Sequence, residues 1–470
     1  MKKPMGRARV LVVGWDCAAP ALVFDRYRDV MPNTQALMSR GMWGNLRSSV
    51  PPITVPAWAC MTSGRDAGEL GVYGFRDREA GSYELSLVDS SRIEAKRIWD
   101  FLGEHGRTSS VLFVPPSYPP QAHAHGEMVS CFLTPSSESD WAAPAQLKEE
   151  LRAKYGEYLM DVDGVRGGDK QVLLRDLHAM TRQHFAVARH MWSTRNPDFM
   201  MMVEIGPDRL HHAMWNAMDP FHPRASTDPV LQQGARDYYA LLDQELGALL
   251  ALTDEDTTVL VVSDHGARSM QGGVCINEWL IQNGWLVLNE RPTAVTPLRS
   301  SMVNWEKTRA WGEGGYYARV FLNVRGREPR GSIPSGQHAK VREELSAALQ
   351  ELRGKNGEVF DNLVVDPHAY YREARGNPPD LCVIFDQLAW RSIGSVGHGV
   401  VFAHDNDQGD DGCNHDWEGI FVMAGPHVEN VGATSGLSLY DVTPTVLSLF
   451  DIPVPADLLG RDLTRGATRS

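Results

Sequence analysis

A run of four aliphatic residues at positions 259–262 constrains the fold of this chain most strongly. Apolar runs without polar interruption are typical of strands that are buried on both faces of a parallel sheet. The run leads directly into Asp264 and His265, and Gly266 then allows the backbone to turn. Ligands of open α/β sheets bind just beyond the carboxyl ends of the strands. A carboxylate and an imidazole at that position predict a site for a metal ion such as zinc.

Two further strand ends carry the same residue types. Residues 10–14 are an apolar run followed by Asp16, and residues 198–204 lead to Asp208 and His212. Because Asp208 and His212 are four positions apart, they share one face of a helical turn and are spaced to hold one ion. Asp16 taken alone is also a suitable N-cap for a helix, and a histidine at this spacing also suits a core or surface position.

A proline-rich segment, PPITVPAW at residues 51–58, predicts a helix through residues 57–61, because Pro56 is tolerated in a first helical turn. This places Thr54 at the N-terminus of the helix. Its hydroxyl there either caps the helix or acts as a nucleophile, whose alkoxide the helix dipole and a bound metal would favour. The glycine-rich loop at residues 64–74 would let the backbone pass close to a ligand.

The alternation of strands and helices predicts an α/β fold with an insertion. The alternation breaks after residue 266, so we expect a core in two parts, residues 1–266 and 401–470, separated by a substrate-selecting cap at residues 267–400. We expect residues 412–425 to form a loop that presents His415, followed by the last core strand. Helices are expected at residues 33–39, 174–195, 235–252, 339–353 and 441–450.

Composition limits the classes of partner. The formal charge of −13 argues against nucleic-acid polymers and anionic membranes as main partners, whereas a small anionic substrate stays compatible because bound cations reverse the local field. The six cysteines are scattered without a CxxC pair, which is typical of reduced thiols in the cytoplasm. No apolar run approaches the roughly 20 residues of a membrane span. We therefore expect a cytoplasmic protein; the sequence carries no signal for its oligomeric state.

Seven candidate residues, one hydroxyl and six carboxylates or imidazoles, occur in order at strand ends or in adjoining loops: Asp16, Thr54, Asp208, His212, Asp264, His265 and His415. Two divalent ions roughly 4 Å apart need about this number of ligands. Their order resembles the alkaline phosphatase superfamily, specifically its branch of type I phosphodiesterases and nucleotide pyrophosphatases. PPITVPAW at residues 51–58 and GVYGF at residues 71–75 are similar to segments of a group of predicted bacterial and archaeal phosphohydrolases or phosphomutases.

The resemblance implies an alkaline-phosphatase-like three-layer sandwich, with a mostly parallel central sheet flanked by helices. It further implies that Thr54 attacks phosphorus in line and forms a phosphothreonine intermediate. The second metal would stabilise the leaving oxygen and then activate the hydrolytic water. Two zinc ions are implied, with manganese as the alternative: one held by Asp16, Asp264, His265 and the Thr54 oxygen, the other by Asp208, His212 and His415.

Two positions depart from the pattern of this branch. Ala57 stands where an asparagine often follows the proline, and Phe75 lies near the position of another asparagine that holds a phosphoryl oxygen. Arg76 is the candidate to take over that contact by charge-assisted hydrogen bonding, although it also suits an exposed surface. Further candidates for substrate contact, each equally suited to a polar surface near a cleft, are Arg209, His211 and His404.

The sequence favours a two-metal phosphohydrolase that cleaves phosphodiesters, nucleotide-type substrates among them. The preference for a diester rests on Thr54 and on the resemblance, and no arginine or lysine is obviously placed to neutralise the second charge of a monoester, although Arg76 could do so. The alternatives are a phosphomonoesterase, a metal-dependent phosphomutase and, least favoured, a non-catalytic binding protein. The related mutases use a serine nucleophile, which Thr54 does not match.

Overall fold

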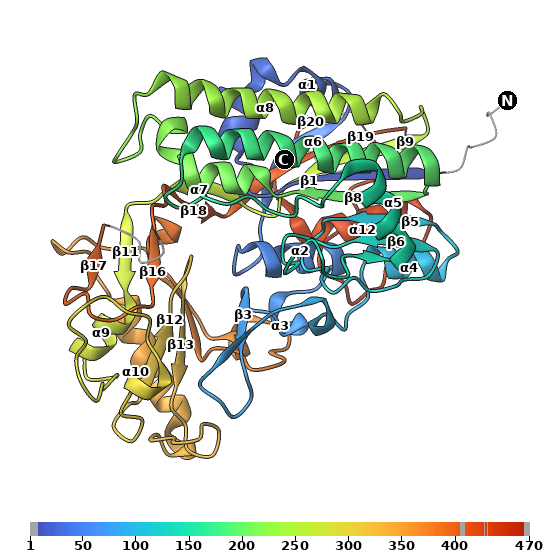
Figure 1. Ribbon diagram of the computed structural model, residues 1–470. Helices are drawn as coiled ribbons and strands as arrows, with labels where there is room; N and C mark the ends of the chain where they lie inside the picture. Colours follow the sequence, from blue (N-terminus) through green and yellow to red (C-terminus); the bar gives the residue numbers. More distant parts are fainter. Residues whose placement is uncertain (1–7, 405–408, 427, 430, 465–470) are drawn as a thin grey trace.

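The computed structural model describes residues 8–404, 409–426, 428–429 and 431–464 (Figure 1). Within these residues, the central sheet has ten strands. Five neighbouring strands pair in parallel: β9, β1, β8, β5 and β6. Strand β19 is antiparallel to both of its neighbours. The strand order is β20 (Gly432–Ala433), β2 (Met42–Arg47), β19 (Glu418–Ala424), β9 (Thr257–Val262), β1 (Arg9–Trp15), β8 (Phe199–Glu204), β5 (Ser109–Leu112), β6 (Gly126–Val129) and β7 (Ala142–Ala143), with β21 (Leu437–Ser438) also beside β2. The predicted mostly parallel sheet is confirmed.

The three middle strands, β9, β1 and β8, are buried almost throughout, as their apolar runs predicted. Side chains of β1 alternate between the hydrophobic cores on the two faces of the sheet. The register pairs Gly14 with both Val203 and Val262, so the carboxyl ends of the three strands lie level. The polar residues that follow these strands therefore start from one edge of the sheet.

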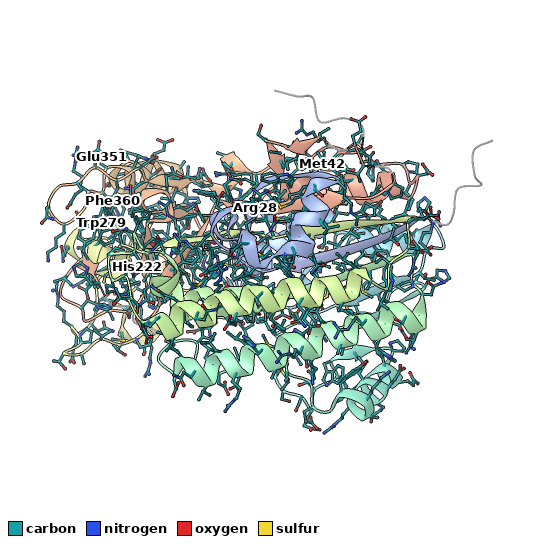
Figure 2. All side chains as sticks on the ribbon, turned by 90° about the horizontal axis from the view of Figure 1, so that it is seen from above. Arg28, Met42, His222, Trp279, Glu351 and Phe360 are labelled. Atoms are coloured by element: carbon teal, nitrogen blue, oxygen red, sulfur yellow. The ribbon has the colours of Figure 1, made fainter. Side chains whose placement is uncertain are left out.

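Helices cover both faces of the sheet, which confirms the three-layer α/β sandwich (Figure 1). One face carries α1 (Pro32–Ser39), α5 (Ala145–Tyr155), α6 (Lys170–Arg195), α7 (Gly206–Met218) and α8 (Pro229–Leu250). The other carries α2 (Thr54–Ser63), α3 (Ala67–Leu70), α4 (Ile98–Glu104) and α12 (Val442–Leu449). Seen from above, α6 and α8 run side by side (Figure 2). No helix in the described part of the chain is long and apolar enough to cross a membrane.

A second lobe with its own hydrophobic core lies between β10 (Gly266–Ser269) and β18 (Cys413–Asp416) in the sequence (Figure 1). One antiparallel sheet contains β12 (Ala310–Glu313), β13 (Ala318–Leu322), β15 (Leu381–Ile384) and β14 (Leu363–Val365). A smaller sheet contains β16 (Trp390–Ile393), β11 (Gly272–Cys275) and β17 (Phe402–Ala403), and the helices are α9 (Ile276–Gln282), α10 (His338–Gln350) and α11 (Pro367–Tyr370). This arrangement supports the proposal of an inserted cap at residues 267–400.

A hairpin from the first part of the chain also packs on this lobe. It consists of β3 (Arg76–Arg78) and β4 (Leu85–Leu87). Arg78 forms a buried ion pair with Glu328 at 2.6 Å, and the Tyr83 ring stacks on Trp305 with centroids 3.5 Å apart. We therefore include residues 76–87 with the proposed cap, although they precede it by about two hundred positions in the sequence.

His415 lies in a strand, so the loop predicted around it is wrong. The strand, β18, pairs antiparallel with β10, and Ala267 is the partner of His415. The segment is too polar to show the alternation by which strands are identified in a sequence, yet its backbone is fully paired with β10. The pairing brings His415 next to the end of β9 and to His265.

Candidate metal centre

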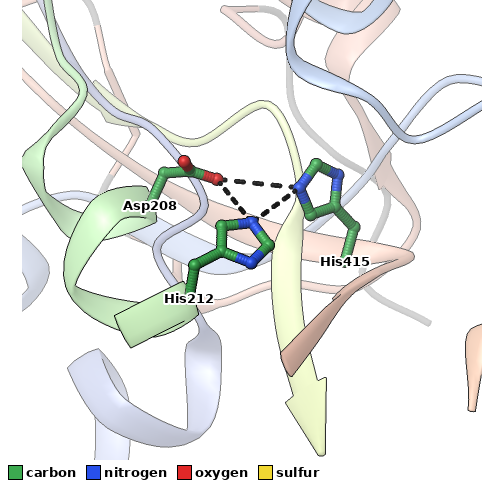
Figure 3. A group of neighbouring side chains, drawn as sticks. All are labelled: Asp208, His212 and His415. Carbon is green, nitrogen blue, oxygen red and sulfur yellow. Dashed lines mark hydrogen bonds and ion pairs between the residues drawn. The ribbon is translucent and has the colours of Figure 1, made fainter. Parts of the chain in front are cut away.

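Three buried side chains from α7 and β18 form what we call the second ligand group (Figure 3). Asp208 and His212 lie one turn apart on α7, directly after β8, and His415 faces them. Asp208 Oδ1 is 3.3 Å from His212 Nε2 and 3.6 Å from His415 Nε2, and the two Nε2 atoms are 3.4 Å apart. The structure thus brings together the three residues that the family resemblance implied as ligands of one ion.

The first ligand group consists of Asp16, Asp264 and His265, at the ends of β1 and β9. His265 Nε2 is 3.2 Å from Asp264 Oδ2 and 3.8 Å from Asp16 Oδ1. Thr54, the first residue of α2, places its Oγ1 3.3 Å from the same nitrogen. The two groups adjoin, because the rings of His265 and His415 stack with centroids 3.7 Å apart.

The spacing of these atoms fits divalent metal ions. Ligands about 2.0–2.1 Å from a tetrahedral ion lie about 3.4 Å from one another, and the contacts within each group span 3.2 to 3.8 Å. One oxygen of each carboxylate has no hydrogen-bond partner among the described residues: Asp16 Oδ1, Asp208 Oδ1 and Asp264 Oδ2. The other oxygens accept from the Trp58 indole for Asp16 (2.7 Å), the Cys17 backbone for Asp264 (3.2 Å) and Arg209 for Asp208 (2.6 Å). Each carboxylate is thus held by a hydrogen bond to one oxygen, and its other oxygen is available to a metal ion.

Each imidazole is oriented by an acceptor at Nδ1. The acceptors are the Gly266 carbonyl for His265 (3.0 Å), the Pro52 carbonyl for His415 (2.9 Å) and Asp411 Oδ1 for His212 (2.8 Å). A proton on Nδ1 leaves the lone pair on Nε2, the atom that faces the carboxylates. Burial lowers the pKa of His265 and of His415, so both rings stay neutral as metal ligands require.

The carboxylates favour a cation at this place. Burial, reinforced by the charge of a neighbouring carboxylate, raises the pKa of both Asp16 and Asp264 well above its ordinary value. Ionised carboxylates taken out of water need a positive partner at short distance. A divalent ion in each ligand group would meet that need.

Asp411 is a functional residue that sequence reasoning missed. Its Oδ2 accepts from Arg391 at 3.0 Å and pairs with Arg166 at 3.2 Å, while its Oδ1 accepts from His212. Burial alone would raise the pKa of Asp411, but His212 and the two arginines lower it to about 2. Cys413 Sγ also lies 3.4 Å from His212 Nδ1. Because Asp411 is already bonded to Nδ1 and Arg391, we assign it to orienting His212 rather than to holding an ion.

A cavity of about 590 Å³ opens from His212 towards the second lobe. Of the predicted substrate contacts, Phe75, Arg76 and Arg209 line it. Arg209 is held by two 2.8 Å bonds to Asp161, whereas Arg76 is exposed. Two further lining residues that sequence reasoning missed are Arg166 and Tyr316. Both come from irregular segments that carry no readable motif.

His211 does not reach the cavity. It is fully buried, its Nε2 lies 2.8 Å from the Tyr239 hydroxyl on α8, and burial lowers its pKa to about 3. One step along a helix turns a side chain by about 100°, so His211 faces α8 while His212 faces the ligand group. His404 is exposed and also lies outside the cavity lining.

Comparison with known proteins now gives the family. The model of the type I phosphodiesterase/nucleotide pyrophosphatase family matches residues 10–416 of the 470, a span that includes both ligand groups and Thr54. The chain belongs to this family. Its members are phosphoesterase hydrolases, and the two ligand groups agree with the metal dependence of the family. A search of curated protein sequences finds no significant match.

Solved structures of the same fold cover nearly the whole chain. Phosphonoacetate hydrolase from Sinorhizobium meliloti, in complex with phosphonoformate, is 16% identical with a TM-score of 0.62, over 95% of this chain and 97% of that one. An inactive variant of murine ectonucleotide pyrophosphatase/phosphodiesterase 5, in complex with AMP, is 12% identical with a TM-score of 0.56, over 97% of each chain. The human protein is 13% identical with a TM-score of 0.55, over 95% of this chain and 96% of its own. These likenesses show a shared fold.

Proposed function

We propose that this chain uses two divalent metal ions and the Thr54 hydroxyl to hydrolyse phosphodiesters, nucleotide-type esters among them. The observation that carries the proposal is the adjoining pair of ligand groups. Thr54 Oγ1 lies 3.3 Å from His265 Nε2 in the first group, and the cavity opens at His212 of the second group. Nucleophile, metal ligands and substrate space therefore meet at one place. In-line displacement at phosphorus by two metals needs these parts together.

In the proposed reaction the Thr54 hydroxyl gives its proton to water, and its oxygen forms a bond to phosphorus as the bond to the ester oxygen breaks and that oxygen leaves with the electron pair. The phosphoryl group then stays on Thr54 until water hydrolyses it. Thr54 stands in the first turn of α2, where the helix dipole favours a developing alkoxide. The two ions would supply electrostatic stabilisation of the attacking and leaving oxygens and a nucleophilic water at neutral pH.

Zinc is the proposed metal, because imidazole and carboxylate ligands suit it and the contact distances fit a tetrahedral ion; manganese is the second candidate. The proposed substrate is a small anionic phosphate ester. The neighbours solved with phosphonoformate and with AMP support this size and charge. All six cysteines are buried and free, which supports the proposed cytoplasmic location.

A phosphomonoesterase is the second candidate, and a specific observation favours it. The sequence identified only Arg76 as a partner for the extra charge of a monoester. In the structure, Arg209 and Arg166 also line the cavity wall, and Arg209 contacts Asp208 of the second ligand group. Fixed guanidinium groups near the reacting phosphoryl group would lower the energy of a doubly charged ester.

Hydrolysis of bis(p-nitrophenyl) phosphate and of p-nitrophenyl phosphate by metal-analysed protein separates the two candidates. We expect about two metal ions per chain, faster cleavage of the diester, and loss of turnover in Thr54→Ala. Thr62→Ala is the matched control, because Thr62 lies on the same helix but its hydroxyl donates to the Trp58 carbonyl at 2.7 Å. Faster cleavage of the monoester would favour the phosphomonoesterase. Protein without metal or turnover would contradict both.

A further inference from the structure

Tyr316 brings a phenolic hydroxyl from the second lobe to the second ligand group. Its ring stacks on His415 with centroids 3.7 Å apart and planes 22° apart. Its hydroxyl oxygen lies 3.2 Å from His212 Nε2. The Asn414 side chain donates to the backbone carbonyl of Tyr316 at 3.2 Å, so backbone and ring are both fixed against β18. Nothing in the sequence around Tyr316 predicted this contact.

The surrounding hydrogen bonds determine where the hydroxyl proton points. Arg166 is a donor 3.5 Å from the Tyr316 oxygen, so that oxygen accepts from the arginine and its own proton is directed elsewhere. His212 donates from Nδ1 to Asp411, and its Nε2 is the ring atom that faces Tyr316. Nε2 is also the atom through which His212 would hold a metal ion. A ring nitrogen that binds a metal offers no lone pair to a hydroxyl, and the Tyr316 proton is then free for a substrate oxygen in the cavity.

We propose that Tyr316 is a catalytic residue that donates a hydrogen bond to the leaving-group oxygen. The inference rests on the proposed function, because Thr54 stands against the first ligand group. In-line attack from that side places the leaving oxygen across the phosphorus atom, towards the second ligand group and Tyr316. As the bond between phosphorus and that oxygen breaks, its electron pair stays on the oxygen. Tyr316 stabilises the developing charge and keeps its own proton.

Two neighbouring tyrosines allow a matched comparison. Tyr316→Phe removes the hydroxyl but keeps the ring that stacks on His415. Tyr317→Phe is the control: the Tyr317 hydroxyl is also buried, but it donates to the backbone carbonyl of Tyr73. Each variant therefore loses one phenolic hydrogen bond, and only the first loses it next to a ligand group. Thermal melting of both variants reports on folding independently of activity.

The decisive measurements are the dependence of kcat/KM on the leaving group and the binding of orthovanadate to the metal-loaded proteins. Across aryl phosphodiesters, we expect Tyr316→Phe to lose about 100-fold or more with phenol as the leaving group, and less with p-nitrophenol, whose charge needs less stabilisation. Orthovanadate, which mimics the five-coordinate phosphorus, should bind about 10- to 100-fold more weakly to Tyr316→Phe. Tyr317→Phe should match the wild type in both, and the metal content of all three should be equal.

The outcomes separate this inference from the proposed function. A loss that is equal for all leaving groups, unchanged vanadate affinity, or loss of metal from Tyr316→Phe would each overturn the role given to Tyr316, while the two-metal function would stand. Wild-type protein that binds no metal and cleaves no diester would overturn the proposed function, and this inference with it.

Discussion

Replacing Asp411 with asparagine tests how the chain orients a metal ligand. Asp411→Asn keeps the size of the side chain but removes the charge that accepts the Nδ1 proton of His212 at 2.8 Å. Loss of such an orienting carboxylate costs 10- to 100-fold in metal affinity in other metal sites, or about 1.4–2.8 kcal/mol. The change also leaves Arg391, which is 2% exposed, without its carboxylate at 3.0 Å. Breaking a buried pair in this way costs about 3–5 kcal/mol of folding free energy.

The two effects are separated by a matched control at Asp380. This aspartate is as deeply buried and accepts from Arg327 and His338, but lies in the second lobe away from both ligand groups. Zinc affinity is measured by competition with a chromogenic chelator, and stability by urea unfolding of metal-free protein. We expect both variants to be destabilised and only Asp411→Asn to bind its metal more weakly. Unchanged metal affinity in Asp411→Asn, or an equal loss in Asp380→Asn, would refute the orienting role.

Three further predictions concern the first ligand group, pH and metal removal. Trp58→Phe removes the 2.7 Å hydrogen bond to Asp16 Oδ2. In a metal titration we expect one of the two metal ions to bind about tenfold or more weakly than in the wild type. Metal affinities equal to those of the wild type would contradict this. Arg327 and His338 outweigh the effect of burial and hold the pKa of Asp380 at about 2, below its ordinary 3.8. The ionised carboxylate of Asp380 therefore contributes about 2–3 kcal/mol to the free energy of unfolding above pH 4, and this contribution is lost as pH falls through 2. In urea unfolding, the difference in free energy of unfolding between the wild type and Asp380→Asn should shrink over that pH range. A constant difference would be inconsistent with the lowered pKa. Removing metal with a chelator should lower the melting temperature, and an unchanged one would argue against resident ions.

The sequence predicted the sheet and the aspartates of both ligand groups because one physical rule governs them, whereas the division into two ligand groups, with His415 in the second, was implied by the family resemblance. Strands buried on both faces must be apolar throughout, so each polar residue at a strand end is conspicuous. Asp16, Asp208 and Asp264 were found in this way, and the level strand ends of the sheet explain why they meet. Thr54 followed from the proline that fits a first helical turn.

The residues that surround the ligands could not be predicted in the same way. Tyr316, Arg166 and Asp411 come from irregular segments far apart in the sequence, and only tertiary packing brings them together. His211 was a candidate on the correct helix, but its side chain faces α8 and not the cavity. Which side a helical residue faces depends on the exact phase of the helix, which the sequence did not reveal. The strand that carries His415 was missed because tertiary pairing with β10 overrides its polar sequence.

The central claim is that Thr54 carries the phosphoryl group between two in-line displacements. The stereochemical course at phosphorus tests it most directly, with a chiral phosphorothioate diester hydrolysed in isotopically labelled water by the metal-loaded protein. Each in-line displacement inverts the configuration, so two displacements give net retention. The account predicts retention. Net inversion would show direct attack by water and would contradict a phosphothreonine intermediate.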